Sequence, residues 1–98
     1  MTRPTRCRRI CMEPAYDSFF PDGVLTGEEV IMTLDEYETI RLIDLEEYTQ
    51  HECAKQMNIS RTTVAEIYKS ARYKMADSVV NGKQLLITGG NYQFCDGM

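Results

Sequence analysis

The sequence predicts a mainly α-helical fold, in which a three-helix domain contains a helix-turn-helix and short extended segments at both ends can pair as strands. Three observations predict it. A threonine followed three residues later by a glutamate, the pattern of a helix start, occurs at Thr33 and again at Thr49. Ser60, a strong helix-capping residue, follows shortly after the second start. Short aliphatic runs flank the helical part on both sides.

The first helix is expected to begin after Thr33 and to run to about Glu47. In this capping box the threonine accepts from a backbone N–H and Glu36 reaches back to the cap. The apolar residues at helical spacing are Leu34, Tyr37, Ile40, Leu45 and Tyr48. Leu42 and Ile43 fall outside this stripe, so the helix is expected to be buried on more than one side.

A second helix is expected from the second capping box to Met57, and a third from Ser60 to about Asn81. Asn58 stands in the turn between them, and asparagine tolerates left-handed backbone better than most residues. The apolar stripe of the third helix is formed by Val64, Ile67, Tyr68, Ala71, Met75 and Val79. The predicted helix-turn-helix spans residues 49–69.

The chain of 98 residues has the length of one domain, so a single helix-turn-helix domain is expected over residues 1–98. It divides into an extended N-terminal arm (1–32), a helical core (33–82), and a C-terminal strand and tail (83–98). The candidate strands are residues 7–12, 30–32 and 85–87. The tail strand can pair with the N-terminal segment of the same chain or of a second copy.

The composition is that of a soluble globular protein, with 43% hydrophobic and 27% charged residues. No stretch approaches the roughly 20 apolar residues of a membrane span, and no signal-peptide pattern follows the N-terminus. We therefore expect a cytoplasmic protein. Small disulfide scaffolds are denser in cysteine and are secreted, so free thiols are expected at Cys7, Cys11, Cys53 and Cys95.

Charge is unevenly distributed along the chain, whose net charge is −4. Residues 13–52 hold twelve acids against one base, whereas residues 55–83 hold six bases against two acids. Because salt screens charges beyond roughly 8 to 10 Å, local potential decides whether a surface can contact phosphate. Charge alone favours solvated surfaces, but it does not exclude nucleic-acid binding by the third helix.

The helix-turn-helix indicates DNA binding. Ala54 lets the two helices approach closely, and the wedge between them is filled by Cys53, Met57, Ile59, Val64 and Ile67. In such motifs the exposed residues of the second helix reach base edges and phosphates in the major groove. The candidate DNA-binding residues are Ser60, Arg61, Thr62, Thr63, Glu66, Lys69 and Arg72. The structural alternative is a helical hairpin whose exposed residues are only solvated.

These residues have different expected roles. Arg61 can bond guanine bidentately, which is worth about 1 to 3 kcal/mol of discrimination. Lys69 and Arg72 are suited to phosphate contacts, which add affinity without sequence information. Glu66 can accept from a cytosine amino group or pair with Lys69 on its own helix. Thr62 and Thr63 are candidates for phosphate or thymine-methyl contacts, with cap support as the alternative for Thr63.

Motifs along nearly the whole chain also carry a family resemblance. In the first half they are Arg3-Pro4, Cys7-Arg8-Arg9-Ile10, Pro14, Phe19-x-Pro21-x-Gly23 and Leu34-Asp35-Glu36-x-Glu38-x-Ile40-Arg41-Leu42-x-Asp44. In the second half they are Ala54-x-x-Met57-x-Ile59-Ser60-Arg61-x-Thr63, Ala71-Arg72-x-Lys74-x-Ala76-Asp77 and Gly82-Lys83-x-Leu85-x-Ile87-x-Gly89-Gly90. The chain resembles a family of small uncharacterised prokaryotic proteins described as predicted DNA-binding. Their helix-turn-helix is similar to region 4 of sigma-70 type RNA polymerase factors. The resemblance implies this fold and DNA binding, and it implies no measured operator, effector or enzyme reaction. We expect a transcriptional regulator.

The arginine-rich N-terminus is a candidate DNA-binding arm, formed by Arg3, Arg6, Arg8 and Arg9. Such an arm can enter the minor groove or lie along phosphates. The same arginines can instead pair with the acidic middle of the chain.

Three other functions were weighed. A cysteine-based metal or redox sensor would use Cys7 and Cys11 with Cys95 or His51, but only one loose cysteine pair is present, so we expect no metal and no cofactor. No catalytic residues are expected, because no phosphate-binding glycine loop or catalytic pairing stands out. A sigma-like module that binds polymerase or another protein through the acidic stretch 28–52 remains the main alternative.

The expected partner is double-stranded DNA. Regulators of this kind commonly use two half-sites about 34 Å apart. The extended termini also offer strand edges for exchange, so we expect a homodimer or larger homo-oligomer.

Overall fold

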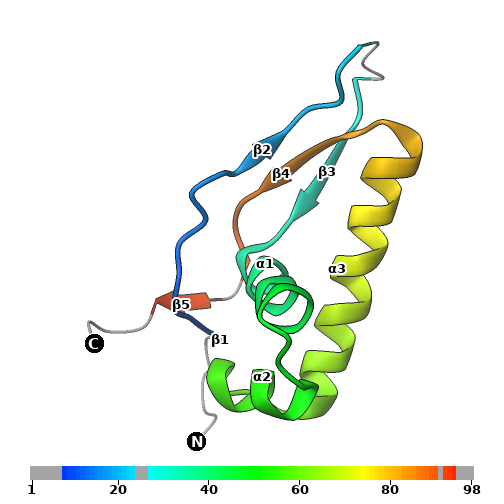
Figure 1. The fold of residues 1–98 in the computed structure, drawn as a ribbon. Coiled ribbons are helices and arrows are strands. Elements are labelled where there is room, and N and C mark those ends of the chain that lie inside the picture. The colour runs from blue at the N-terminus through cyan, green and yellow to red at the C-terminus, as the bar shows by residue number, and fades with distance from the viewer. Residues whose placement is uncertain (1–7, 24–26, 91, 95–98) are drawn as a thin grey trace, which may run out of the picture.

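The computed structural model describes residues 8–23, 27–90 and 92–94. Within them the chain forms three α-helices, a π-helical turn and five short strands (Figure 1). In chain order these are β1 (Arg8–Ile10), β2 (Ser18–Phe19), β3 (Glu29–Met32), α1 (Leu34–Ile40), the π-helical turn η1 (Arg41–Leu45), α2 (Gln50–Met57), α3 (Arg61–Asn81), β4 (Gln84–Ile87) and β5 (Tyr92–Phe94). No helix of this described part is long and apolar enough to cross a membrane.

The three helices begin where local capping chemistry predicts. Thr33 and Thr49 each accept a hydrogen bond from the glutamate N–H three residues later, and each glutamate side chain bonds back to the cap. Ser60 caps α3 by accepting from the N–H of Thr63. The helix ends at Gly82, which takes the left-handed conformation with φ 66°. The predicted starts and the predicted end of α3 are confirmed.

Helix α1 continues directly into η1, where the N–H of Glu46 bonds to the carbonyl of Arg41 at 2.9 Å. Glu47 then takes a positive φ of 64°, which ends the helical path. The predicted length of the first helix is therefore close to the observed one. The burial of Leu42, outside the expected stripe, agrees with the expectation that this helix is buried on more than one side. The stripe is wrong at Leu45, which the wider turn leaves 73% exposed.

The main sheet has the strand order β2-β4-β3. β4 runs parallel to β3 and antiparallel to β2. The parallel pair is joined by the helical segment, because parallel strands need a long crossover connection. On one face of this sheet, Val30, Met32, Leu85 and Ile87 pack in a core cluster with Ala71 of α3.

The second sheet pairs β1 with β5 in parallel and brings the two ends of the described chain together (Figure 1). Ile10 of β1 is fully buried in the same core cluster. The tail strand that was expected to pair with the N-terminal segment is β4, and it does so within one chain by pairing with β2 and β3. β2 and β5 were not predicted, because two or three residues are too short to show an alternating pattern.

Three carboxylates of α1 are buried: Asp35, Glu36 and Glu38. Charge alone had favoured solvated surfaces, and that expectation is wrong for these three residues, although Glu36 also takes its predicted cap role. Burying an unpaired carboxylate is costly, so each of them requires a partner. The partners come from several elements of the fold.

Asp35 and Glu36 bind α1 to its neighbours. Asp35 forms an ion pair with Arg8 of β1 at 3.2 Å. Glu36 accepts hydrogen bonds from Ser70 at 2.6 Å and from the ammonium group of Lys74 at 2.8 Å. Because both Ser70 and Lys74 belong to α3, one carboxylate fixes the position of the long helix against α1.

Glu38 is fully buried. Its two oxygens accept from the guanidinium of Arg41 at 3.0 and 2.9 Å, and the backbone N–H of Cys11 lies 3.3 Å away. This hydrogen bonding to Glu38 raises the pKa of Arg41 above its usual range, although burial opposes the rise. The pair holds the segment after β1 against the start of η1.

Acid is expected to unfold the protein partly through Glu36. Burial raises the pKa of Glu36, but hydrogen bonds from Lys74, Ser70 and the N–H of Thr33 outweigh it and lower the pKa below 4.5. A lowered folded-state pKa contributes stability above the unfolded value that is lost as pH falls through the folded value. Glu36→Gln should lower stability at neutral pH by about 1 to 3 kcal/mol and flatten its dependence on pH below about 5.

Urea denaturation of the wild type and of Glu36→Gln at pH 6 and pH 3 measures this effect. Glu52→Gln is the matched control, because Glu52 holds the same capping position on α2 but is exposed. The control should still lose stability on acidification. An equal loss for Glu36→Gln and the wild type would contradict the assigned role of Glu36.

Gly90 is expected to tolerate no side chain. Its φ is 101°, and a Cβ there would lie 2.5 Å from Asp35 Oδ1 and 2.7 Å from Thr33 Cβ. Gly90→Ala should therefore destabilise the fold by about 2 kcal/mol or more. Gly82→Ala is the control, because Gly82 also has positive φ but meets nothing within 4 Å, and about 1 kcal/mol is expected there. Thermal unfolding of both variants compares the two costs, and equal costs would rule out the close approach.

Candidate nucleic-acid interface

The turn between α2 and α3 consists of the three residues Asn58, Ile59 and Ser60. Asn58 takes the left-handed conformation with φ 62° and ψ 46°, as predicted, and its N–H is donated to the carbonyls of Ala54 and Lys55. The N–H of Ile59 also bonds to the Ala54 carbonyl, at 3.0 Å. The carbonyls at the end of α2 are thereby satisfied, and α3 starts in a fixed direction.

A second core cluster holds the two helices together. Cys53, Ala54 and Met57 of α2 pack with Val64 of α3 and with Leu42 of η1. Ile59 packs against this cluster, and Ile67 of α3 is also buried. The residues expected to fill the wedge between the helices are thus buried or half-buried, and the small Ala54 is 4% exposed.

At the start of α3, some residues form the helix cap and others are exposed. Ser60 Oγ accepts from the N–H of Thr63 at 3.1 Å, and the two hydroxyl oxygens lie 2.9 Å apart. Thr63 is half-buried, so it supports the cap, which was the alternative role expected for it. Arg61 and Thr62 are exposed and point away from this cap network.

Further along α3, Ala65, Glu66 and Lys69 are exposed. With Thr62 they recur at three- and four-residue spacing, so they share one face of the helix. This face lies opposite the buried Val64 and is called the outer face of α3 below. It brings together Thr62, Glu66 and Lys69 of the predicted site residues.

Arg72 is exposed but tethered. Its guanidinium carbon lies 5.2 Å from the centre of the Tyr68 ring and its Nη1 donates to the Tyr68 hydroxyl at 3.0 Å. The hydroxyl in turn donates to Asp44 at 2.7 Å, and this bond raises the pKa of Tyr68. Tyr68, one helical turn before Arg72, was expected only in the apolar stripe. Sequence reasoning missed Asp44 as the partner of Tyr68, because it lies 24 residues away on η1.

The predicted arginine arm is partly used inside the fold. Arg8 pairs with Asp35, which is the alternative role expected for these arginines. Arg9 donates to the carbonyls of Gln56 at 2.8 Å and Lys55 at 3.3 Å, so it binds the C-terminal end of α2. Arg3 and Arg6 lie outside the described residues.

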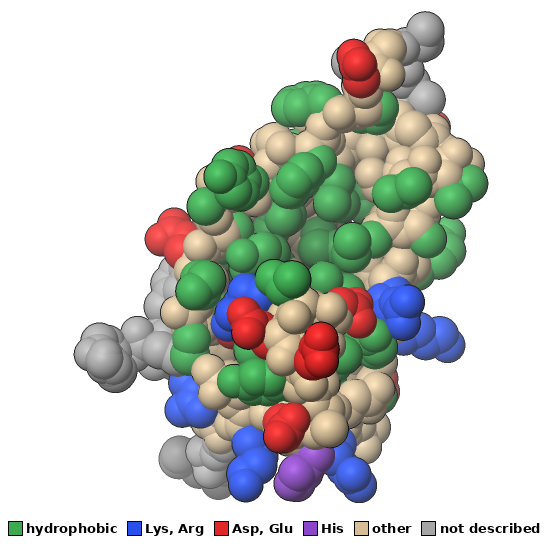
Figure 2. Space-filling view, in the orientation of Figure 1, with side chains coloured by type: hydrophobic (Ala, Val, Ile, Leu, Met, Phe, Trp, Pro, Cys, Tyr) green, Lys and Arg blue, Asp and Glu red, His purple; other side chains and the backbone are tan. Residues whose placement is uncertain are grey.

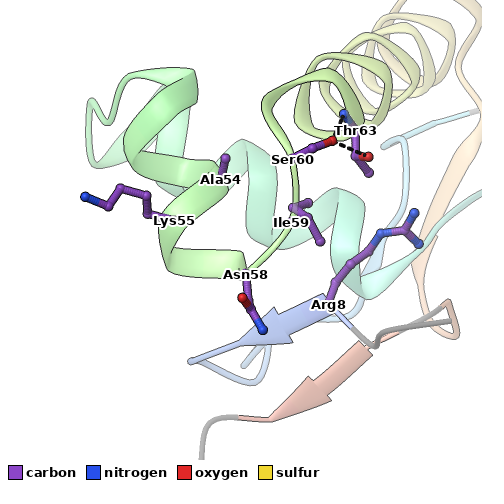
Figure 3. A pocket seen from close by; sticks show the side chains of 7 residues that line it. All are labelled: Arg8, Ala54, Lys55, Asn58, Ile59, Ser60 and Thr63. Atoms are coloured by element: carbon purple, nitrogen blue, oxygen red, sulfur yellow. Dashed lines mark hydrogen bonds between the residues drawn. The ribbon is translucent and has the colours of Figure 1, made fainter. Parts of the chain in front are cut away.

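A shallow hollow of about 640 Å³ lies beside the turn (Figure 3). It is lined by Arg8, Ala54, Lys55, Asn58, Ile59, Ser60 and Thr63. Figure 3 shows the hydrogen-bonded Ser60 and Thr63 at the start of α3, with Lys55 extending away from α2. Lys55 was not among the predicted site residues. Its position next to Ala54 in the second helix was the sequence signal that could have identified it, and the residue is exposed.

Polar and apolar side chains occupy different parts of the face in Figure 2. Lysines, arginines and the histidine gather at the end formed by α2 and the start of α3. Hydrophobic side chains gather over the main sheet and the C-terminal half of α3. Cationic groups available for an anionic partner are therefore concentrated near the turn.

The cysteines differ from expectation in one respect. Cys11 is disulfide-bonded, so the expectation of free thiols is wrong for it. Its sulfur also lies 3.1 Å from the amide nitrogen of Gln56 on α2. Cys53 is a free, buried thiol whose pKa is raised to about 11 by burial. Cys7 and Cys95 lie outside the described residues.

Comparison with known proteins gives a consistent family. Residues 1–95 match the family model described as "Protein of unknown function DUF134". A UPF0251 protein of Desulfitobacterium hafniense is 55% identical over 100 residues, which cover 100% of this chain and 80% of that protein. A UPF0251 protein of Thermoanaerobacter pseudethanolicus is 48% identical over 98 residues, covering 98% of this chain and 83% of that protein.

No solved structure gives a significant match. The family match extends over both sheets and all three helices that the structure describes, so it concerns the whole arrangement and not the helical pair alone. The chain belongs to the DUF134 family of proteins of unknown function.

Proposed function

We propose that this protein binds double-stranded DNA sequence-specifically as a transcriptional regulator in the cytoplasm, with the N-terminal half of α3 in the major groove. One observation carries the proposal: a short α2, a left-handed turn at Asn58 and a capped α3 whose outer face is free of contacts with the core. These features support the assignment of a helix-turn-helix. A helix about 10 to 12 Å across fits a major groove about 12 Å wide.

The exposed residues of α2 and of the N-terminal half of α3 supply groups suited to base recognition and to phosphate contact. Arg61, at the first position of α3, can donate bidentately to guanine. Glu66 can accept from a cytosine amino group and repels misplaced phosphate. Lys69 adds a phosphate contact farther along the helix, and Lys55 adds one from α2.

Binding of a DNA phosphate at the start of α3 has further support. The 21-residue helix places the positive end of its dipole there, next to the hollow beside the turn. Arg72 reaches the same flank from its position over Tyr68. Because its partner Tyr68 is in turn bonded to Asp44, whose carboxylate offsets part of the local positive charge, we assign Arg72 a smaller share of phosphate binding than Lys69.

A second candidate function is binding to a polymerase or regulatory protein, as in sigma-like modules. Leu45 favours it, because this side chain is 73% exposed between the exposed carboxylates Asp44 and Glu46. Against it, Asp35, Glu36 and Glu38 of the acidic stretch are consumed in internal pairs. DNA binding through α3 remains the better-supported function.

Lys69→Ala is expected to weaken binding to any duplex and to reduce the slope of log affinity against log salt by about one. A duplex that binds the protein is first selected from a randomised pool and labelled. Its binding is then measured by fluorescence anisotropy at several salt concentrations. Lys83→Ala removes an equal charge at the other end of α3 and should keep the wild-type slope. A wild-type slope near zero would exclude a phosphate footprint.

Arg61→Ala is expected to relax specificity at one base-pair position and to cost about 1 to 3 kcal/mol on the selected duplex. Binding to unselected duplexes should fall much less. Selection repeated with the variant compares the base preference position by position. An unchanged base preference would show that Arg61 does not take part in base recognition. If the double variant Arg61→Ala with Lys69→Ala still binds a protein partner, the second candidate function is favoured.

A further inference from the structure

We infer that the C-terminal half of α3 pairs with the same surface of a second copy of this chain. The surface is a groove of about 430 Å³ lined by Asp44, Arg72, Met75, Ala76, Val79 and Val80. It is called the α3 groove below. It lies beyond the outer face, on the half of the helix that α2 does not reach.

The α3 groove carries an apolar stripe with no cover from the described part of the chain. Met75 and Val79 are one helical turn apart, and both were expected in the buried stripe of this helix. Instead, Met75 is 38% exposed, Val79 is 80% exposed and the neighbouring Val80 is 78% exposed. Between Met75 and Val79 stands the small Ala76, which allows close approach of another helix. Apolar residues at this spacing are typical of a helix that packs on a helix.

The charges at the rim of the groove do not oppose burial. Asp44 and Arg72 both bond the hydroxyl of Tyr68, at 2.7 and 3.0 Å, so each has a partner within its own chain. Bringing a second apolar surface against Met75 and Val79 therefore leaves no unpaired charge at this edge.

The size of the apolar surface also fits a pair of copies. Met75, Val79 and Val80 present on the order of several hundred Å² of apolar surface, which can form the centre of a standard interface of about 800 Å² per partner. Figure 2 shows hydrophobic side chains gathered over the sheet and this half of α3.

The position of the groove favours a second copy over another partner, an argument that rests on the proposed function. From the middle of the segment 61–69 to the middle of the segment 75–80 is about twelve residues, or about 18 Å at 1.5 Å per residue. Two copies paired antiparallel through their grooves would hold their outer faces about 36 Å apart, which matches successive major grooves about 34 to 36 Å apart.

The orientation is also compatible. At about 100° per residue, the outer face of α3 lies roughly a quarter turn around the helix from the stripe of Met75 and Val79. A two-fold axis between paired grooves can therefore point both outer faces toward one side of the dimer. One DNA duplex would then meet both.

Val79→Glu tests the pairing by sedimentation equilibrium of the full chain. The wild type should be a dimer, and the variant, with a buried carboxylate in each copy, should associate at least about 100-fold more weakly. Tyr73→Glu is the matched control: Tyr73 lies on the same helix at 71% exposure but outside the α3 groove, and this variant should remain dimeric. Circular dichroism confirms that each variant is folded.

A monomeric wild type, or a Val79→Glu variant that still dimerises, would overturn the inference. The double variant Arg61→Ala with Lys69→Ala separates this result from the proposed function, because it should remain dimeric while losing DNA binding. Conversely, Val79→Glu should retain salt-dependent binding to duplex DNA with at least about tenfold lower affinity. If neither the wild type nor any variant binds DNA, and Val79→Glu alone is monomeric, the pairing is supported and the proposed function is not.

Discussion

The buried carboxylates of α1 are the constraint on which the rest of the structure depends. Asp35, Glu36 and Glu38 lie within four residues of one another, yet they bond to β1, to α3 and to the segment after β1. Removing water from three anions is costly unless each finds its partner. Partners come from three surrounding elements, although Asp35 Oδ1 is buried without a hydrogen bond among the described residues, so α1 ties β1, α3 and the segment after β1 to the centre of the fold.

This arrangement gives α3 two separate tasks. Its buried side is fixed against α1 by Glu36 and against α2 by the cluster around Val64. Its outer face and its C-terminal half stay exposed, one polar and the other apolar. The charged rim formed by Asp44, Tyr68 and Arg72 separates them. One helix of the described chain thus carries both a polar and an apolar exposed surface.

What the sequence could predict follows the range of the interactions. The helix starts at Thr33, Thr49 and Ser60 were predictable because a cap involves residues only three apart. The left-handed Asn58 was predictable for the same reason. The partner strands of β4 and the buried state of Glu38 were not, because they depend on residues brought together only by the fold. At the candidate site, exposure of Arg61 and Lys69 followed from helical periodicity, whereas the bond between Tyr68 and Asp44 spans 24 residues and left no local pattern.

The unbroken length of α3 makes the helix a mechanical lever. A rotation of about 10° around its C-terminal half moves its N-terminal half, about 18 Å away, through about 3 Å. That displacement is close to the rise of about 3.4 Å per base pair in DNA. On a duplex bound as proposed, a small change in how the C-terminal half is held would therefore shift the other end of the helix by nearly one base pair.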